Sequence, residues 1–163
     1  MASKQIRDPQ KGRLLTSQNA ARVIIDYQPT PVNSINSMNR SQLLRNISLV
    51  AQMAKIYSLP IVLSTVNVAT GANHDTVPVL KSILGDLPSY DRTSINAWED
   101  QEFYDAVKAT GRKKLIMTAL WTEACLAFPT LDALDEGYEV YPVVDAVGGT
   151  SILAHETALR RVE

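Results

Sequence analysis

Short apolar runs alternate with amphipathic stretches along most of this chain, and this alternation constrains the fold more than any other feature of the sequence. The runs are rich in β-branched residues and nearly continuous, which is typical of strands buried on both faces of a parallel sheet. The stretches between them carry apolar residues at helical spacing. The predicted strands are 21–27, 60–66, 89–93, 114–120 and 139–146, and the predicted helices are 41–58, 77–84, 100–111, 123–137 and 150–163.

Strands that alternate with helices predict an α/β fold, a three-layer α/β/α sandwich around a mostly parallel, Rossmann-like sheet. The length of 163 residues suits one domain, 1–163. In such sheets reactive groups gather outside the carboxyl ends of the strands. Those ends carry Asp26, Thr65, Arg92, the segment 121–125 and Asp145.

Charge and composition argue against several classes of partner. The net charge is -1 and the basic clusters, 112–114 and 160–161, are short, so we expect no nucleic acid. No apolar run approaches the ~18 residues of a membrane helix, and the N-terminus lacks a secretory core, so we expect no membrane. The single cysteine cannot form an internal disulfide and fits a reducing compartment, which predicts a cytoplasmic protein.

Cys125 is that single cysteine, and it lies between a predicted strand and a predicted helix. The N–H groups and the positive dipole end of a helix N-terminus favour a thiolate and can lower the pKa of the thiol. The same N–H groups can hold an oxyanion. The alternative is a buried, inert cysteine that only packs.

Two charged residues at strand ends are possible companions of Cys125. Asp26 is either a loop anchor or a carboxylate that faces the edge and acts as a general base. Arg92 either stabilises a thiolate or pairs at the surface with Asp91 or Glu99. His74 and His155, the only histidines, are expected to be solvated or structural and to lie away from the edge.

The sequence contains further stretches that together resemble the isochorismatase-like cysteine hydrolases, and within them the YcaC-type branch. These stretches are "VIIDYQ", "PIVLST", "RTSINAWED", "FYDAVKATGRKKLIMTALWTEACLAFPTLDALDEGYEVYPVVDA" and "ILAHETALRRV", which cover nearly all of the chain from about Ala21. The resemblance implies an isochorismatase-like fold and a catalytic triad of aspartate, lysine and cysteine.

The resemblance assigns this triad to Asp26, Arg92 and Cys125. The lysine of the wider K-x-x-x-S-A-F pattern is replaced here by the arginine of "RTSINAW". Arginine supplies the positive charge but does not readily exchange a proton. A mechanism in which this residue moves protons is therefore not expected.

The resemblance also implies a cis peptide before the nucleophile, expected here at Trp121-Thr122. It would direct the backbone N–H groups of Ala124 and Cys125 at an oxyanion. The expected substrate-pocket residues are Gln28, Asn96, Trp98 and Trp121. For the two tryptophans a role in the core or in subunit contacts is an open alternative.

The implied activity is hydrolysis of a C–N, amide-type bond of a small molecule, with a homo-oligomer, an octamer, as the assembly. Family members also cleave a vinyl ether, so the expectation of a C–N bond depends on the resemblance alone. No metal and no cofactor are expected, because "STVNVATGANHD" lacks the D-x-H motif of nicotinamidases and no G-x-G-x-x-G follows the first strand. Relatives usually continue with a further strand and helix beyond the position of Glu163.

A second function class is an oligomeric assembly or binding protein whose site is vestigial. The arginine at the lysine position favours it. A nucleotide-binding domain is a weaker alternative, because the glycine fingerprint is absent.

Overall fold

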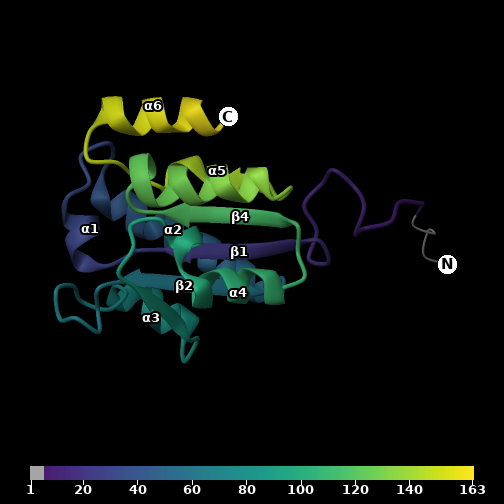
Figure 1. The fold of residues 1–163 in the computed structure, drawn as a ribbon, viewed down its shortest axis with the longest axis horizontal. Helices are drawn as coiled ribbons and strands as arrows, with labels where there is room; N and C mark the ends of the chain where they lie inside the picture. The colour runs from purple at the N-terminus through teal and green to yellow at the C-terminus, as the bar shows by residue number, and fades with distance from the viewer. Residues whose placement is uncertain (1–5) are drawn as a thin grey trace.

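A computed structural model describes residues 6–163, and five strands in it form one parallel sheet (Figure 1). The strands are β1 (Ala20–Ile25), β2 (Ile61–Val66), β3 (Ser89–Arg92), β4 (Lys114–Ala119) and β5 (Glu139–Pro142). Their order is β3-β2-β1-β4-β5, so β1 lies at the centre and β3 and β5 lie at the edges. This arrangement confirms the α/β fold that the alternating sequence pattern predicts.

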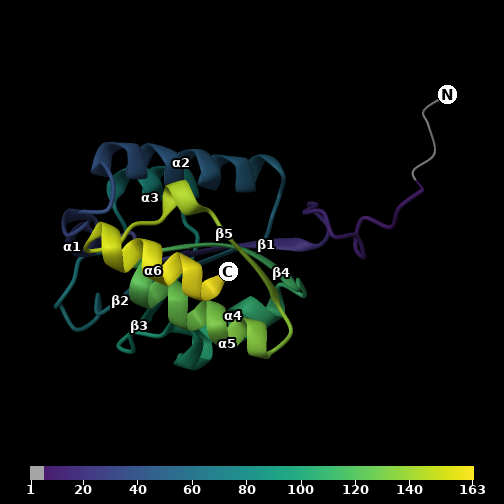
Figure 2. The same ribbon diagram turned by 90° about the horizontal axis from the view of Figure 1, so that it is seen from above.

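Helices cover both faces of the sheet. They are α1 (Pro29–Asn33), α2 (Arg40–Ile56), α3 (Pro78–Leu84), α4 (Gln101–Ala109), α5 (Ala127–Asp135) and α6 (Ile152–Val162). Figure 2 shows α2 and α3 on one face and α4 and α5 on the other. Helix α6 packs against α5 and against the turn that follows β4. No helix of residues 6–163 is both long enough and apolar enough to cross a membrane.

The central strand β1 supplies both halves of the core, because successive side chains of a strand point to opposite faces. Val23 and Ile25 pack with Phe103 of α4 on one face. Ile24 packs with Leu43 of α2 on the other. All six residues of β1 are buried, as expected for the middle of a doubly covered sheet.

Two predicted elements have different limits in the structure. The last strand ends at Pro142, one further bond to β4 is donated by the N–H of Val143 to the carbonyl of Met117, and the next residues form the 3-10 turn η3 (Val144–Ala146). The predicted helix 123–137 is divided into a π-helical turn, η2 (Thr122–Leu126), and α5. Pro129 is the third residue of α5, where a missing N–H is tolerated. Helix α1 and the 3-10 turn η1 (Ala97–Glu99) were not predicted.

Candidate active site

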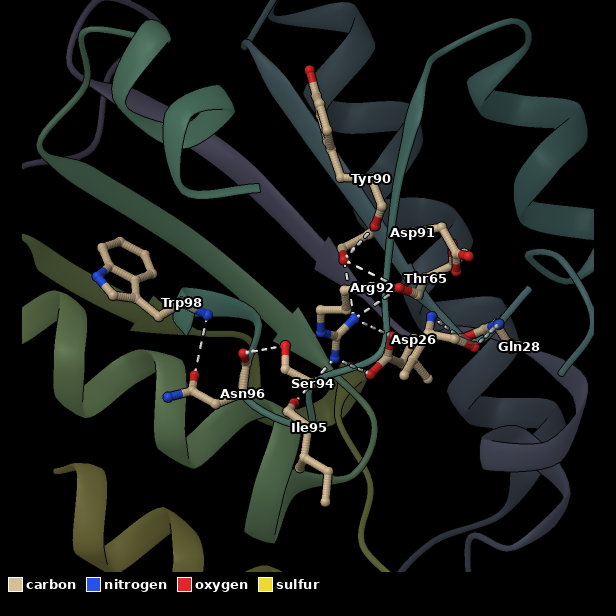
Figure 3. Close-up of polar contacts among 12 residues, drawn as sticks. Asp26, Gln28, Thr65, Tyr90, Asp91, Arg92, Ser94, Ile95, Asn96 and Trp98 are labelled. Carbon is tan, nitrogen blue, oxygen red and sulfur yellow. Dashed lines mark hydrogen bonds and ion pairs between the residues drawn. The ribbon is translucent and has the colours of Figure 1, made fainter. Parts of the chain in front are cut away.

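The carboxyl edge of the sheet brings together the three residues expected to act as a triad. Asp26 directly follows β1, Arg92 is the last residue of β3, and Cys125 lies in η2 after β4. Arg92 reaches across β2 to Asp26, as Figure 3 shows. The Cys125 thiol is close enough to Asp26 for the charge of this carboxylate to raise its pKa.

Asp26 has an unusual backbone conformation for a residue with a side chain. Its φ is 64°, in the left-handed region that aspartate and asparagine adopt more readily than bulkier residues. Its N–H donates to the carbonyl of Ser64 at 3.0 Å, and its own carbonyl accepts from the N–H of Gln28 at 2.8 Å. The chain therefore turns sharply at the end of β1 and leaves the carboxylate, which is fully buried, at the edge of the sheet.

Arg92 binds Asp26 through both ends of its guanidinium group. The Nη1 atom donates to Oδ1 at 2.8 Å and Nη2 donates to Oδ2 at 2.6 Å, while both side chains are excluded from solvent. Burial alone would lower the pKa of Arg92, but the hydrogen bonds and charge of Asp26 outweigh it and raise that pKa. Arg92 is therefore a permanent cation, fixed against the carboxylate by two parallel hydrogen bonds.

Polar groups of β2 complete the binding of Arg92. Its Nη1 also donates to the hydroxyl of Ser64 and to the carbonyl of Thr65, both at 3.0 Å, and Nη2 donates to the carbonyl of Ile95 at 3.2 Å. Of the three guanidinium nitrogens of Arg92, only Nε has no hydrogen-bond partner among residues 6–163. The sequence analysis did not select Ser64. In the sheet register Ser64 pairs with Ile25, the residue before Asp26. A polar residue beside the last residue of the central strand is therefore a signal that could have identified it.

Cys125 is buried, with 5% of its surface exposed, and its thiol is neutral at rest. Burial, followed by the charge of Asp26, raises the pKa of Cys125 to about 12, although Arg92 and a backbone hydrogen bond from Trp121 oppose this rise. The expectation of a lowered pKa is therefore wrong. A helix N-terminus contributes roughly 1 kcal/mol, which burial beside a carboxylate exceeds.

The turn that carries Cys125 differs in one detail from the expected geometry. The cis peptide is Leu120-Trp121, one bond before the predicted Trp121-Thr122. Trp121 is the N-cap residue of η2 and has an extended backbone, so the cis bond precedes the cap residue and not the first helical residue. The N–H of Ala124, an expected oxyanion donor, donates to the carbonyl of Trp121 at 3.2 Å at rest.

The four expected pocket residues have different environments. Gln28 is fully buried, and its amide binds Val66 and the carbonyl of His74. Trp98 lies in the core, which is the alternative that the sequence left open, and its Nε1 donates to Glu136. Trp121 is half-buried and donates to the hydroxyl of Ser34 at 2.6 Å.

Asn96 lines a cavity at the surface of the protein. This cavity, of about 560 Å³, lies between the segment 94–99, α5 and the end of α6. Its apolar wall is formed by Ile95, Phe128 and Leu131, and its charged groups are Glu99, Asp132 and Arg161. Asp26, Arg92 and Cys125 are not among the lining residues, although Phe128 in the cavity wall follows Cys125 by only three residues in the chain.

The two histidines behave differently from each other. His74 lies in the loop after β2, where its backbone carbonyl accepts from Gln28. His155 was expected to lie away from the edge, but its Nδ1 is 2.8 Å from the hydroxyl of Thr122, in the turn of the cysteine. Over residues 6–163, no three His, Cys, Asp or Glu side chains are grouped so that they could hold a metal ion.

The fold and this edge together define an α/β protein in which a thiol, a carboxylate and a guanidinium meet at the carboxyl ends of parallel strands. Such a set is suited to nucleophilic catalysis. Residues 20–163 match the isochorismatase domain, and the chain belongs to that family.

Two similar proteins are YcaC of Escherichia coli and YcaC of Pseudomonas aeruginosa. The chain is 36% identical over 149 residues to the probable hydrolase YcaC of Escherichia coli (strain K12), covering 91% of this chain and 71% of that protein. The structure of Pseudomonas aeruginosa YcaC with hexane-2,5-diol and covalent acrylamide is 34% identical, with a TM-score of 0.87 over 92% of this chain and 74% of that chain.

Two further solved structures place the fold more broadly. E. coli YcaC, described as an octameric hydrolase of unknown specificity, is 33% identical, with a TM-score of 0.85 over 99% of this chain and 76% of that chain. A nicotinamidase/pyrazinamidase of Bacillus subtilis is 15% identical, with a TM-score of 0.70 over 87% of this chain and 93% of that chain. That last likeness concerns the fold alone.

Replacing Asp26 with asparagine should destabilise the protein strongly, because it leaves the buried cation of Arg92 without its counter-charge. We expect a loss of about 3–5 kcal/mol in the free energy of unfolding, measured by urea denaturation. Asp86→Asn, at an exposed position, is the matched control and should change little. Equal midpoints for the two variants would contradict the importance of the ion pair.

Proposed function

We propose that the protein is a cysteine hydrolase that cleaves an amide-type C–N bond of a small molecule through a covalent intermediate on Cys125, with Asp26 as the base. The observation that carries this proposal is the placement of a neutral thiol beside a carboxylate that Arg92 holds by two hydrogen bonds. A neutral thiol needs a base at the moment of attack, and Asp26 is the neighbouring group that can accept the proton.

The first half of the reaction forms the acyl-enzyme. Asp26 takes the proton of Cys125 as Sγ forms a bond to the carbonyl carbon of the substrate, and the π electrons of the carbonyl move to oxygen. The N–H groups of Ala124 and Cys125 bind this oxyanion, and Ala124 gives up its 3.2 Å bond to Trp121 to do so. When the carbonyl re-forms, the C–N bond breaks and the leaving nitrogen takes the proton from Asp26.

The second half releases the acid. Asp26 accepts a proton from a water molecule, whose oxygen attacks the thioester carbonyl. The C–S bond then breaks, and the proton held by Asp26 returns to Cys125. The sum is consumption of one water and cleavage of one C–N bond, with the enzyme restored.

Arg92 has an electrostatic role in this scheme. Its pKa is raised, so it stays charged throughout and transfers no proton. Its positive charge stabilises the carboxylate of Asp26 at rest. It stabilises the oxyanion of the substrate while Asp26 is protonated. The replacement of lysine by arginine therefore assigns every proton transfer to Asp26.

We propose that the cavity lined by Asn96 is the substrate pocket. We propose that its apolar wall of Ile95 and Phe128 receives the body of the substrate. Gln28 and Trp121 act in this proposal by holding the loop after β2 and helix α1 around the site. Trp98 acts from the core, by supporting η1 next to Asn96.

A relative's chemistry supports a reactive cysteine. The P. aeruginosa YcaC structure contains covalent acrylamide, an electrophile that combines readily with thiols. The alternative, an assembly protein with a vestigial site, is favoured by the raised pKa of Cys125. The two proposals differ in whether Cys125 becomes acylated.

Incubation with a panel of small hydrophobic amides and carbamoyl compounds, followed by mass spectrometry, should reveal an acyl adduct on Cys125. Cys125→Ala should form no adduct and lose turnover completely. Cys125→Ser should lose at least about a hundredfold, because a hydroxyl is a weaker nucleophile. Turnover retained in Cys125→Ala would exclude the mechanism, and a panel that gives neither adduct nor product would favour the vestigial site.

We also propose a homo-octamer, as in the octameric E. coli YcaC. Exposed apolar side chains support subunit contacts: Leu49, Met53 and Ile56 follow one stripe of α2, and Ile152 and Leu153 lie at the start of α6. Light scattering after size-exclusion chromatography should give eight times the mass of one chain. Leu49→Glu combined with Met53→Glu should lower that mass, and a monomeric parent protein would contradict the proposal.

A further inference from the structure

Helix α6 contacts the turn of the cysteine through one side-chain hydrogen bond. The Nδ1 atom of His155, on α6, lies 2.8 Å from the hydroxyl of Thr122, the first residue of η2. Thr122 is completely buried, and its backbone N–H donates to the carbonyl of Gly148 at 2.9 Å. The start of η2 is therefore held twice, by its backbone and by its hydroxyl.

The chain around this contact is packed so that α6 can approach the turn closely. A Cβ atom at Gly149 would lie 2.5 Å from Oε2 of Glu123 and 3.0 Å from the Cβ of His155, so a larger residue there would force Glu123 and α6 to shift. Glu123, the second residue of η2, accepts from the N–H and the hydroxyl of Thr150 through its Oε1. The segment 149–155 is thus fitted to the first two residues of η2.

We propose that His155 is a positioning residue for Cys125: by binding the hydroxyl of Thr122 it fixes the π-helical turn and keeps the thiol beside Asp26. Neither His155 nor Thr122 is placed among the reacting groups. This inference rests on the proposed role of Cys125 as the nucleophile.

The geometry explains why the hydroxyl matters. Thr122 and Cys125 are three positions apart in a single π-helical turn, so a rotation at Thr122 moves Sγ directly. No side chain caps this turn at Trp121, which leaves Thr122 as its first side-chain anchor. Burial lowers the pKa of His155, while Glu123 and Glu156 oppose the change, so the imidazole is neutral near neutral pH and accepts or donates at Nδ1.

The rate at which iodoacetamide alkylates Cys125 tests this role without any substrate. Asp26 suppresses the thiolate, so a thiol that moves away from it should react faster. We expect His155→Ala and Thr122→Val each to raise the rate at about pH 8 by about tenfold, and to slow turnover wherever a substrate is known. His155→Asn, which places a polar atom where Nδ1 lies, and Thr122→Ser should both restore the parent rate within about twofold.

The double variant distinguishes positioning from general loosening. If His155 acts through Thr122, His155→Ala combined with Thr122→Val should react no faster than Thr122→Val alone. Ala158→Gly loosens the buried face of α6 at another position and is the control. Additive effects, parent rates in both single variants, or an equal rise in Ala158→Gly would overturn the inference. Because alkylation requires no turnover, these outcomes are separate from a failure of the proposed hydrolysis.

Discussion

The buried ion pair of Asp26 and Arg92 is the interaction on which the rest of this site depends. It joins the edge strand β3 to the central strand β1 across β2, with both side chains excluded from water. Removing two charges from water costs several kcal/mol for each ion, so such a pair persists only with good geometry and with its other hydrogen bonds satisfied. Ser64, Thr65 and Ile95 satisfy those bonds.

Burial, together with the neighbouring carboxylate of Asp26, determines the state of the thiol. The carboxylate of Asp26 lies next to a buried sulfur, and two like charges in a low-dielectric site oppose each other. The pKa of Cys125 rises to about 12 as a result, with burial as the larger cause. In the proposed mechanism the nucleophile is therefore stored with its proton, and the proton leaves only when a substrate carbonyl can take the electrons.

The sequence predicts the fold, and it predicts that Asp26, Arg92 and Cys125 lie at the carboxyl edge of the sheet. Buried β-branched runs locate the strands, and the rule that reactive groups lie at carboxyl ends selects Asp26, Arg92 and Cys125 together. From the residue alone, however, an inert core cysteine was the favoured interpretation of Cys125. Only the family resemblance gave the three residues their separate roles, and these roles remain a proposal.

What the sequence does not predict depends on contacts between distant segments. The raised pKa of Cys125 follows from burial and from Asp26, which lies far away along the chain. The contact between His155 and Thr122 is formed by the packing of α6 on η2. The division of the predicted helix 123–137 and the position of the cis bond were likewise not predicted. Local propensity carries none of this information.

The ionisation state of Cys125 tests the account most directly. The chain has one cysteine, so labelling cysteine Cβ with ¹³C gives a single resonance that reports thiol or thiolate. The account predicts that this resonance keeps its thiol position from about pH 6 to about pH 10, because the pKa is well above the ordinary cysteine value. A titration to the thiolate with a midpoint below about pH 8 would contradict it.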